Sequence, residues 1–177
     1  MKTTSLSRRA FVSGAAAVTA AYAPFSQAQS QADTSGVQKF LSQWDQAWAN
    51  HDAHALSLLV TEGIVTVNRF GTLIPGREAL QKALAFLHGE SGPFGHAKFP
   101  PLTISVLRKI AEGVMIVQAN WQNPVMNPDG KIDPVKVSDM IVTIVLVKDG
   151  EQWKATEMDL HNVEKMDLPY SQPGQKK

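Results

Sequence analysis

The sequence predicts an α+β fold in which a curved, mainly antiparallel sheet wraps around N-terminal helices in a cone-like arrangement. Two features of the 177-residue chain lead to this prediction. In the first half, apolar residues recur at i, i+3, i+4 and i+7, the spacing of an amphipathic helix. After Pro101 the apolar period switches to two, and short turn sequences separate the segments. Helices followed by a meander of strands are typical of the α+β class.

The first two helices are expected near the start of the domain. Ser35 and Gln38 have the spacing of a capping box, which predicts that the first helix begins there. Asp52 can cap a second, short helix that extends to Val60. The apolar stripe of the first helix consists of Val37, Phe40, Leu41, Trp44, Ala47 and Trp48.

The rest of the domain is expected to alternate between strands and loops after one more helix. A third helix is predicted over about 77–88, with Leu80, Ala83, Leu84 and Leu87 inward. Strands are predicted over 64–70, 102–110, 114–121, 135–147 and 153–163. Gly and Pro make 89–101 a long loop, either a lid or a mobile edge, and 122–134 a second loop. A sheet curved around a helix leaves a tapering cavity, where we expect the functional site.

Residues 1–28 predict a twin-arginine signal peptide. The pair Arg8-Arg9 is followed by Phe11, an uncharged and weakly apolar run, and the cleavage pattern Ser26-Gln27-Ala28. An ordinary secretory signal is the alternative, but Phe11 and the low hydrophobicity favour the twin-arginine route. The uncharged run is shorter than the roughly 20 apolar residues of a stable membrane span. We therefore expect a periplasmic protein without stable membrane insertion after the signal is removed.

The mature chain is predicted to form one domain. We expect a disordered leader over 29–34, the domain over 35–165 and a flexible tail over 166–177. Without the signal, 14 basic residues stand against 16 acidic ones, a net charge of −2. This balance argues against a nucleic-acid partner, which requires a basic face. The absence of cysteine excludes disulfides, thiolate metal sites and cysteine nucleophiles.

Three segments carry a family likeness, in order along the mature chain. They are Phe40-x3-Trp44-x3-Trp48-x3-Asp52-x3-Leu56-x2-Leu59, Gly71-x4-Gly76-Arg77-Glu78-Ala79-Leu80, and Trp153-Lys154 followed by His161-Asn162. Together they resemble the SnoaL-like domains of the nuclear transport factor 2-like superfamily, especially the SgcJ/EcaC-type subgroup. The resemblance implies a cone-shaped, cystatin-like α+β fold, commonly a homodimer, with a pocket between sheet and helices.

The resemblance does not select a reaction. Members of the superfamily include ketosteroid isomerases, polyketide cyclases, dehydratases and epoxide hydrolases, and a fold does not by itself choose a function. The isomerases polarise a carbonyl with a buried tyrosine, whereas Tyr22 lies in the signal and Tyr170 in the tail. No dinucleotide fingerprint or other redox-cofactor motif is present, so no cofactor is expected.

Candidate catalytic residues lie on the last predicted strand. Strict alternation puts Glu157, Asp159 and His161 on the same side as Trp153 and Ala155. If that side faces the cavity, His161 can act as a general base oriented by Asp159, and Glu157 can contact the ligand. Another possibility is a solvated sheet face, with the core formed by the opposite side, and a bulge would reconcile the two. No second cluster with ligand spacing accompanies these residues, so no metal is expected. The opposite side carries Met158 and Leu160.

Five further residues are candidates for ligand binding. Trp44 and Trp48 lie one turn apart on the first helix and can serve as core, as a stacking surface, or as both. Asn68 interrupts the apolar face of the first strand two residues before Phe70, and a buried amide requires partners. Trp121 ends a strand beside a loop and is expected at the mouth of the cavity.

Two functional hypotheses follow. The first is a domain that binds a small, largely apolar organic molecule, with or without cofactor-free acid–base chemistry of the isomerase, cyclase or dehydratase type. The second is a non-catalytic ligand-binding or dimeric interaction module. The direction in which Asp159 and His161 face distinguishes them.

Overall fold

The structure is a computed structural model in which residues 31–127 and 131–163 are described. Its elements are α1 (Gln31–Ala49), α2 (Ala53–Leu58), β1 (Val60–Val67), β2 (Leu73–Pro75), α3 (Arg77–His88), β3 (Thr103–Ala111), β4 (Val114–Met126), β5 (Ile132–Asp149) and β6 (Gln152–Asn162). The expected signal peptide and the expected tail over 166–177 lie outside the described residues. None of the helices described is long and apolar enough to cross a bilayer.

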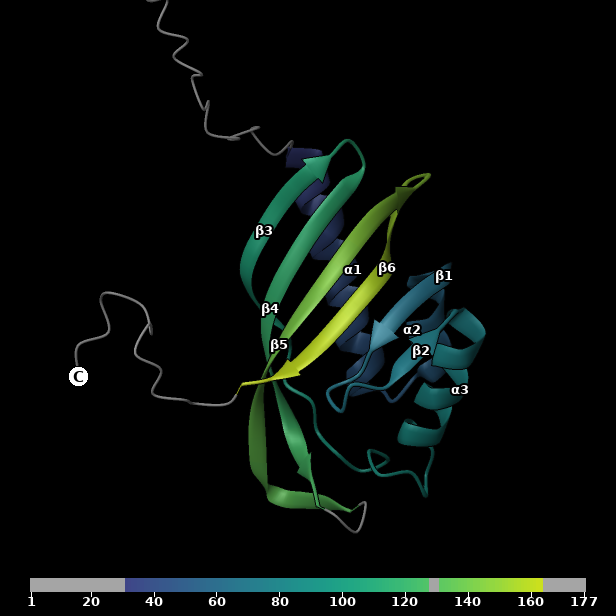
Figure 1. The fold of residues 1–177 in the computed structure, drawn as a ribbon, viewed down its shortest axis with the longest axis vertical. Coiled ribbons are helices and arrows are strands. Elements are labelled where there is room, and N and C mark those ends of the chain that lie inside the picture. Colours follow the sequence, from purple (N-terminus) through teal and green to yellow (C-terminus); the bar gives the residue numbers. More distant parts are fainter. Residues whose placement is uncertain (1–30, 128–130, 164–177) are drawn as a thin grey trace, which may run out of the picture.

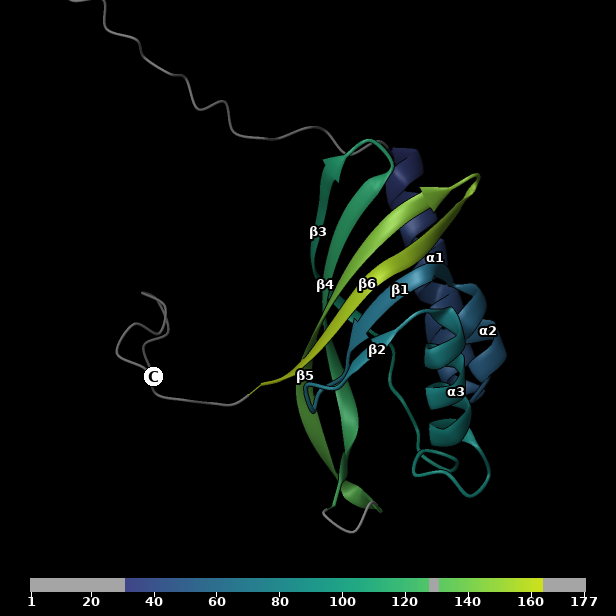
Figure 2. The ribbon, with the colours of Figure 1, turned by 45° about the vertical axis from the view of Figure 1, so that its right-hand side comes forward.

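The six strands form one sheet in the order β2-β1-β6-β5-β4-β3 (Figure 1). Strands β1 and β6 are parallel, and every other neighbouring pair is antiparallel. The sheet is curved, and all three helices lie against one of its faces (Figure 2). The predicted fold class, an α+β fold with a mainly antiparallel curved sheet, is confirmed.

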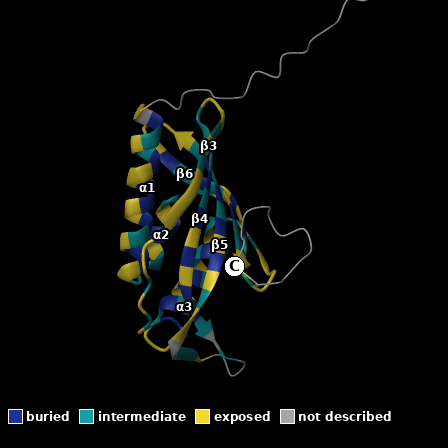
Figure 3. Ribbon diagram, turned by 90° about the vertical axis from the view of Figure 1, so that its left-hand side faces the viewer, coloured by how far each residue is buried: buried dark blue, intermediate teal, exposed yellow. Residues whose placement is uncertain are grey.

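Helix α1 packs its apolar stripe against the inner face of the sheet. All six residues of the predicted stripe are buried, and the exposed positions of α1 lie away from the sheet (Figure 3). A β-carbon at Gly36 would come within 2.6 Å of the Trp153 ring, so this glycine permits the close approach of α1 to β6. At the end of α1, Asp52 caps α2 as predicted, because its Oδ1 accepts from the backbone N–H of Ala55 at 2.8 Å.

The predicted start of the first helix is wrong. Residues 31–34, expected within a disordered leader, already form the first turn of α1, so Ser35 is not an N-cap. Within this turn Asp33 is buried, and its Oδ2 accepts from Nζ of Lys109 at 3.1 Å. This tertiary ion pair with β3 extends the helix upstream of the capping signal.

The loop predicted over 122–134 is also largely absent. Strands β4 and β5 continue through this region as a paired hairpin, with Gln122 opposite Asp139 and Pro124 opposite Val137. Pairing of β3 with β4 ends at Asn120, so the other edge of β4 is unpaired beyond that point. A proline is tolerated on such an edge because no neighbouring strand requires its missing N–H.

Candidate functional site

A cavity of about 120 Å³ lies between the helices and the inner face of the sheet. Residues on the side of the sheet that carries the helices line it: they come from α1, α3, β1, β2, β4, β5 and β6, from the turn after β1 and from the loop that follows α3. Most of the lining is aliphatic or aromatic. The lining comprises Trp44, Trp48, Thr66, Asn68, Arg69, Phe70, Ile74, Leu80, Ala83, Leu84, Leu87, Phe94, Leu102, Trp121, Asn123, Met140, Val142, Met158 and Leu160.

An aromatic cluster around Trp48 forms one end of the cavity. The Trp48 ring meets Trp121 edge-on at 4.7 Å and Phe99 at 5.0 Å, and it lies 6.4 Å from Phe94. Edge-to-face pairs at these distances stabilise the cluster beyond their buried area. The indole of Trp121 also donates to the backbone carbonyl of Pro100 at 2.9 Å. The glycine-rich segment after α3 is thus attached to β4 and forms one wall of the cavity.

Two buried polar atoms of the cavity lining lack a hydrogen-bond partner among the described residues. They are Nε1 of Trp48, a residue 7% exposed, and Oγ1 of Thr66, a residue 4% exposed. A buried donor or hydroxyl without a partner costs about 1–3 kcal/mol, so native proteins rarely retain one without a reason. Both atoms belong to residues that line the cavity.

The mouth of the cavity is formed by the turn after β1. The side-chain Oδ1 of Asn68 accepts from the backbone N–H groups of Phe70 and Thr72, each at 3.0 Å. Phe70 is 64% exposed, and the Arg69 guanidinium lies 5.0 Å from its ring centre. The turn therefore presents an aromatic ring and a cation at the entrance.

The predicted inward facing of Glu157, Asp159 and His161 is wrong. On β5, Val145 pairs with Glu157 and Leu146 pairs with Ala155, so β6 contains one extra residue, Thr156. This β-bulge reverses the alternation. Upstream of it Trp153 and Ala155 are buried, and downstream of it Met158 and Leu160 line the cavity.

The three ionisable side chains therefore lie on the outer face of the sheet. Glu157 and His161 are exposed, Asp159 is half-buried, and none of them is among the cavity-lining residues. An acid–base pair in the cavity formed by Asp159 and His161 is excluded by this geometry. Among the described lining residues, Arg69 is the one with a charged side chain.

The structure brings the other predicted ligand-binding residues together. Trp44, Trp48, Asn68, Phe70 and Trp121 all line the cavity, although Trp121 lies in its wall, with 3% exposure, and not at its mouth. Three polar lining residues were not predicted from the sequence: Thr66, Arg69 and Asn123. Thr66 could have been found, because it precedes Asn68 by two residues and side chains alternate along a strand.

A histidine pair, with His88 buried and His51 half-buried, lies next to the aromatic cluster. Nδ1 of His88 is 2.9 Å from Nδ1 of His51, and the His88 ring meets Trp48 edge-on at 4.5 Å. Burial, with a smaller contribution from the nearby His51, lowers the pKa of His88 to about 4. His88 is thus a neutral imidazole at neutral pH, and it does not line the cavity. Within residues 31–127 and 131–163, no three His, Asp or Glu side chains gather as a metal site would require.

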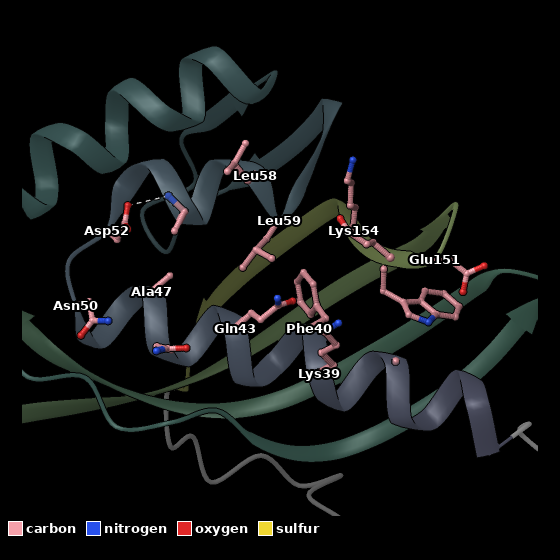
Figure 4. A pocket seen from close by; sticks show the side chains of 15 residues that line it. Lys39, Phe40, Gln43, Ala47, Asn50, Asp52, Leu58, Leu59, Glu151 and Lys154 are labelled. Atoms are coloured by element: carbon pink, nitrogen blue, oxygen red, sulfur yellow. Dashed lines mark hydrogen bonds between the residues drawn. The ribbon is translucent and has the colours of Figure 1, made fainter.

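A larger groove of about 600 Å³ lies on the opposite side of α1, next to α2 and the β5–β6 turn (Figure 4). Its rim consists of polar side chains such as Lys39, Gln43 and Glu151. The Lys154 ammonium there is paired with Asp149 at 2.6 Å, and the Asp52 carboxylate caps α2. Because this groove is broad and has a polar rim, the smaller apolar cavity is the stronger candidate site.

Comparisons with known proteins identify the fold. No protein-family model and no curated protein matches the sequence. A protein with a cystatin-like fold from Caulobacter vibrioides has a TM-score of 0.61 and 20% identity, covering 74% of this chain and 89% of that one. A putative dehydratase of the NTF2-like family from Streptomyces avermitilis has a TM-score of 0.59 and 13% identity, covering 75% and 98%. A ketosteroid isomerase-like protein from Erwinia carotovora atroseptica has a TM-score of 0.60 and 11% identity, covering 74% and 96%.

Proposed function

We propose that this chain, which has the fold of the nuclear transport factor 2-like superfamily, binds a small, largely apolar organic molecule in the cavity between its helices and its sheet. The observation that carries the proposal is an apolar cavity whose lining includes two buried polar atoms without a protein partner, Trp48 Nε1 and Thr66 Oγ1. Apolar walls with a few convergent polar groups are characteristic of small-molecule sites. The finer assignment to the SnoaL-like group rests on the three sequence segments and is part of the proposal.

The geometry favours binding over acid–base catalysis. The residues that would have acted as base and orienter, His161 and Asp159, lie on the other face of the sheet. Isomerase-like and dehydratase-like proteins share the fold, but identities of 11% and 13% carry no catalytic residue over to this chain. We therefore favour the non-catalytic ligand-binding hypothesis.

A fluorescence titration tests the proposal. Three of the four tryptophans line the cavity, so a bound ligand should change their emission. We expect benzyl alcohol, a single ring with one hydroxyl, to produce a saturable change. Replacing Ala83, which lines the cavity from α3, by Phe should fill the space and abolish that change. Ala85→Phe is the matched control, because Ala85 is exposed on the same helix.

Either of two results would contradict the proposal. One is a folded wild-type protein without a saturable response to benzyl alcohol. The other is an Ala83→Phe variant that responds as the wild type does. Native mass spectrometry of protein purified from its own host adds an independent readout, since a retained small molecule would identify the ligand class.

We further propose that the protein is exported through the twin-arginine route and acts in the periplasm. Support comes from the sequence: Arg8-Arg9, Phe11 and the cleavage pattern that ends at Ala28. Replacing both arginines by lysine should retain the chain in the cytoplasm, as measured by cell fractionation. Undiminished export of that variant would refute the route.

A further inference from the structure

We propose that the ligand carries an anionic group, with a carboxylate as the simplest case, and that the Arg69 guanidinium binds this group at the mouth of the cavity. The inference rests on the proposed function and narrows the ligand to a class: a small aromatic or branched aliphatic acid. The cavity volume of about 120 Å³ limits the apolar part. An engineered protein cavity of about 150 Å³ holds one benzene molecule, so a single ring or a short branched chain is the expected size.

Arg69 holds its charge in a partly desolvated position. It lies in the turn after β1, is half-buried and lines the cavity. Burial lowers the pKa of its guanidinium, which means that these surroundings favour the cation less than water does. An arginine nevertheless stays protonated in proteins, so a positive charge is present at the cavity mouth.

The hydrogen bonds of Arg69 leave most of its donors unused. Within the described ranges it donates from Nη1 alone, to the carbonyl oxygen of Pro124 at 3.2 Å and to Oγ of Ser138 at 3.4 Å. Both acceptors are neutral, and no described carboxylate forms an ion pair with Arg69. A guanidinium has five N–H donors in a fork that matches a carboxylate in bidentate geometry.

Arg77, in contrast, has hydrogen-bond partners for all of its side-chain nitrogens. Its Nε and Nη2 donate to the carbonyl oxygen of Val60, and its Nη1 pairs with the Glu62 carboxylate. All three of its nitrogens are thus bonded within the protein. Arg77 thereby supports the start of α3, whereas Nε and Nη2 of Arg69 have no acceptor among the described residues.

The neighbour of Arg69 adds a second donor. Oδ1 of Asn68 is occupied by the backbone N–H groups of its own turn, and this fixes the orientation of the amide. Its NH₂ group, for which no acceptor is found in the described part of the chain, can donate toward the mouth. An entrance that offers a cation and an amide donor suits a ligand end that only accepts hydrogen bonds, such as a carboxylate.

Two probes of the same shape, one charged and one neutral, measure the contribution of the ligand's charge to affinity separately from that of its apolar part. We expect the wild-type protein to bind phenylacetate about 10- to 100-fold more tightly than phenylacetamide, the range expected for hydrogen bonds to a charged group. The Arg69→Gln variant should bind the two probes equally while retaining the wild-type affinity for phenylacetamide. Arg108→Gln is the control, because Arg108 is exposed on β3 and does not line the cavity. Isothermal titration calorimetry gives each affinity.

The results test the anionic ligand separately from the proposed binding of an apolar molecule. If the wild-type protein binds both probes with equal affinity, the anionic ligand is ruled out while the apolar cavity function stands. If Arg69→Gln keeps its preference for phenylacetate, or is folded by circular dichroism and loses both probes alike, Arg69 is not the anion site. If the folded wild type binds neither probe and also fails to bind benzyl alcohol, the proposed function itself fails.

Discussion

His88 is a titratable residue held in an aromatic environment. It is 6% exposed, and its ring packs against the rings of Trp48, Phe94 and Phe99. Its Nε2 has no hydrogen-bond partner among the described residues. Nδ1 faces His51, so one imidazole must donate and the other accept. Protonation of His88 would place a positive charge in an apolar site, close to a second imidazole. This explains why the pKa of His88 is lowered.

The free energy of unfolding should therefore depend on pH through His88. Its folded-state pKa of about 4 lies below the ordinary value of 6.5, so the unfolded chain binds the extra proton first as the pH falls. The stability contribution is complete above pH 6.5, is lost progressively toward pH 4, and amounts to at most about 3 kcal/mol. Urea unfolding between pH 4 and 7 should show a shallower slope for His88→Gln than for the wild type.

His96 provides the control for this measurement. It is exposed in the segment after α3, and His96→Gln should keep the wild-type pH profile. Parallel profiles for His88→Gln and the wild type would show that His88 does not couple protonation to folding.

At the scale of elements, the contact of α1 with β6 depends on the absence of one side chain. Alanine is a better helix former than glycine by up to about 1 kcal/mol, so Gly36→Ala would stabilise an isolated helix. In the folded protein the added β-carbon would lie 2.6 Å from Cδ1 and Nε1 of Trp153, which is buried. Overpacking of this kind costs about 1–3 kcal/mol.

We expect Gly36→Ala to lower the free energy of unfolding by about 1–2 kcal/mol, since the clash outweighs the helix propensity. Chemical denaturation measures the change. Gly63→Ala is the matched substitution, because no atom lies within 4 Å of a β-carbon built at Gly63 in β1. Equal stability changes in the two variants would contradict the tight contact.

Elements with a local signal could be predicted, and elements set by tertiary contacts could not. The stripe of α1, the cap of α2 and the bounds of α3 follow from apolar spacing and capping residues, and all are observed. The first turn of α1 depends on Asp33 meeting Lys109, 76 residues away, and no local pattern reports that pair. The long β4–β5 hairpin likewise depends on pairing that outweighs the local turn propensity of Asn, Pro and Asp.

The candidate site follows the same division. The cavity between the layers could be inferred from the expected fold, and so could nine of its lining residues: the five predicted ligand-binding residues and the four predicted inward residues of α3. The face of the sheet on which residues 157–161 lie could not be predicted, because both sides of β6 carry plausible core residues. The cation at the mouth was not predicted because Arg69 lies in a turn, where residue spacing does not indicate which way a side chain points.

At the scale of the whole molecule, the outer face of the sheet is uncovered in the described part of the chain. None of the described helices covers it (Figure 2). Its side chains are mixed: Val65, Val106 and Ile141 are exposed there beside Glu157 and His161. The three apolar residues stand singly on β1, β3 and β5, on the part of the sheet that the described helices leave uncovered. The resemblance to SnoaL-like domains adds the expectation of a homodimer, and we propose that this face forms it.

Light scattering at micromolar concentration should therefore give twice the mass of one chain. Ile141→Glu should produce a monomer, because it places a charge at the centre of the proposed interface, opposite His161 in register. Leu58→Glu should leave the dimer intact, since Leu58 is exposed on α2, on the other side of the molecule. A monomeric wild type, or a dimeric Ile141→Glu, would remove this face from consideration.

The bulge in β6 has a consequence for the chemistry of the cavity wall. Deleting Thr156 would leave a regular strand with Ala155 inward, Glu157 outward and Met158 inward, so the wall of the cavity would keep its residues. A strand that kept Thr156 without the bulge would alternate strictly from Ala155, which would turn Glu157, Asp159 and His161 inward and Met158 and Leu160 outward. The bulge itself thus separates an apolar wall from one that carries two carboxylates and an imidazole.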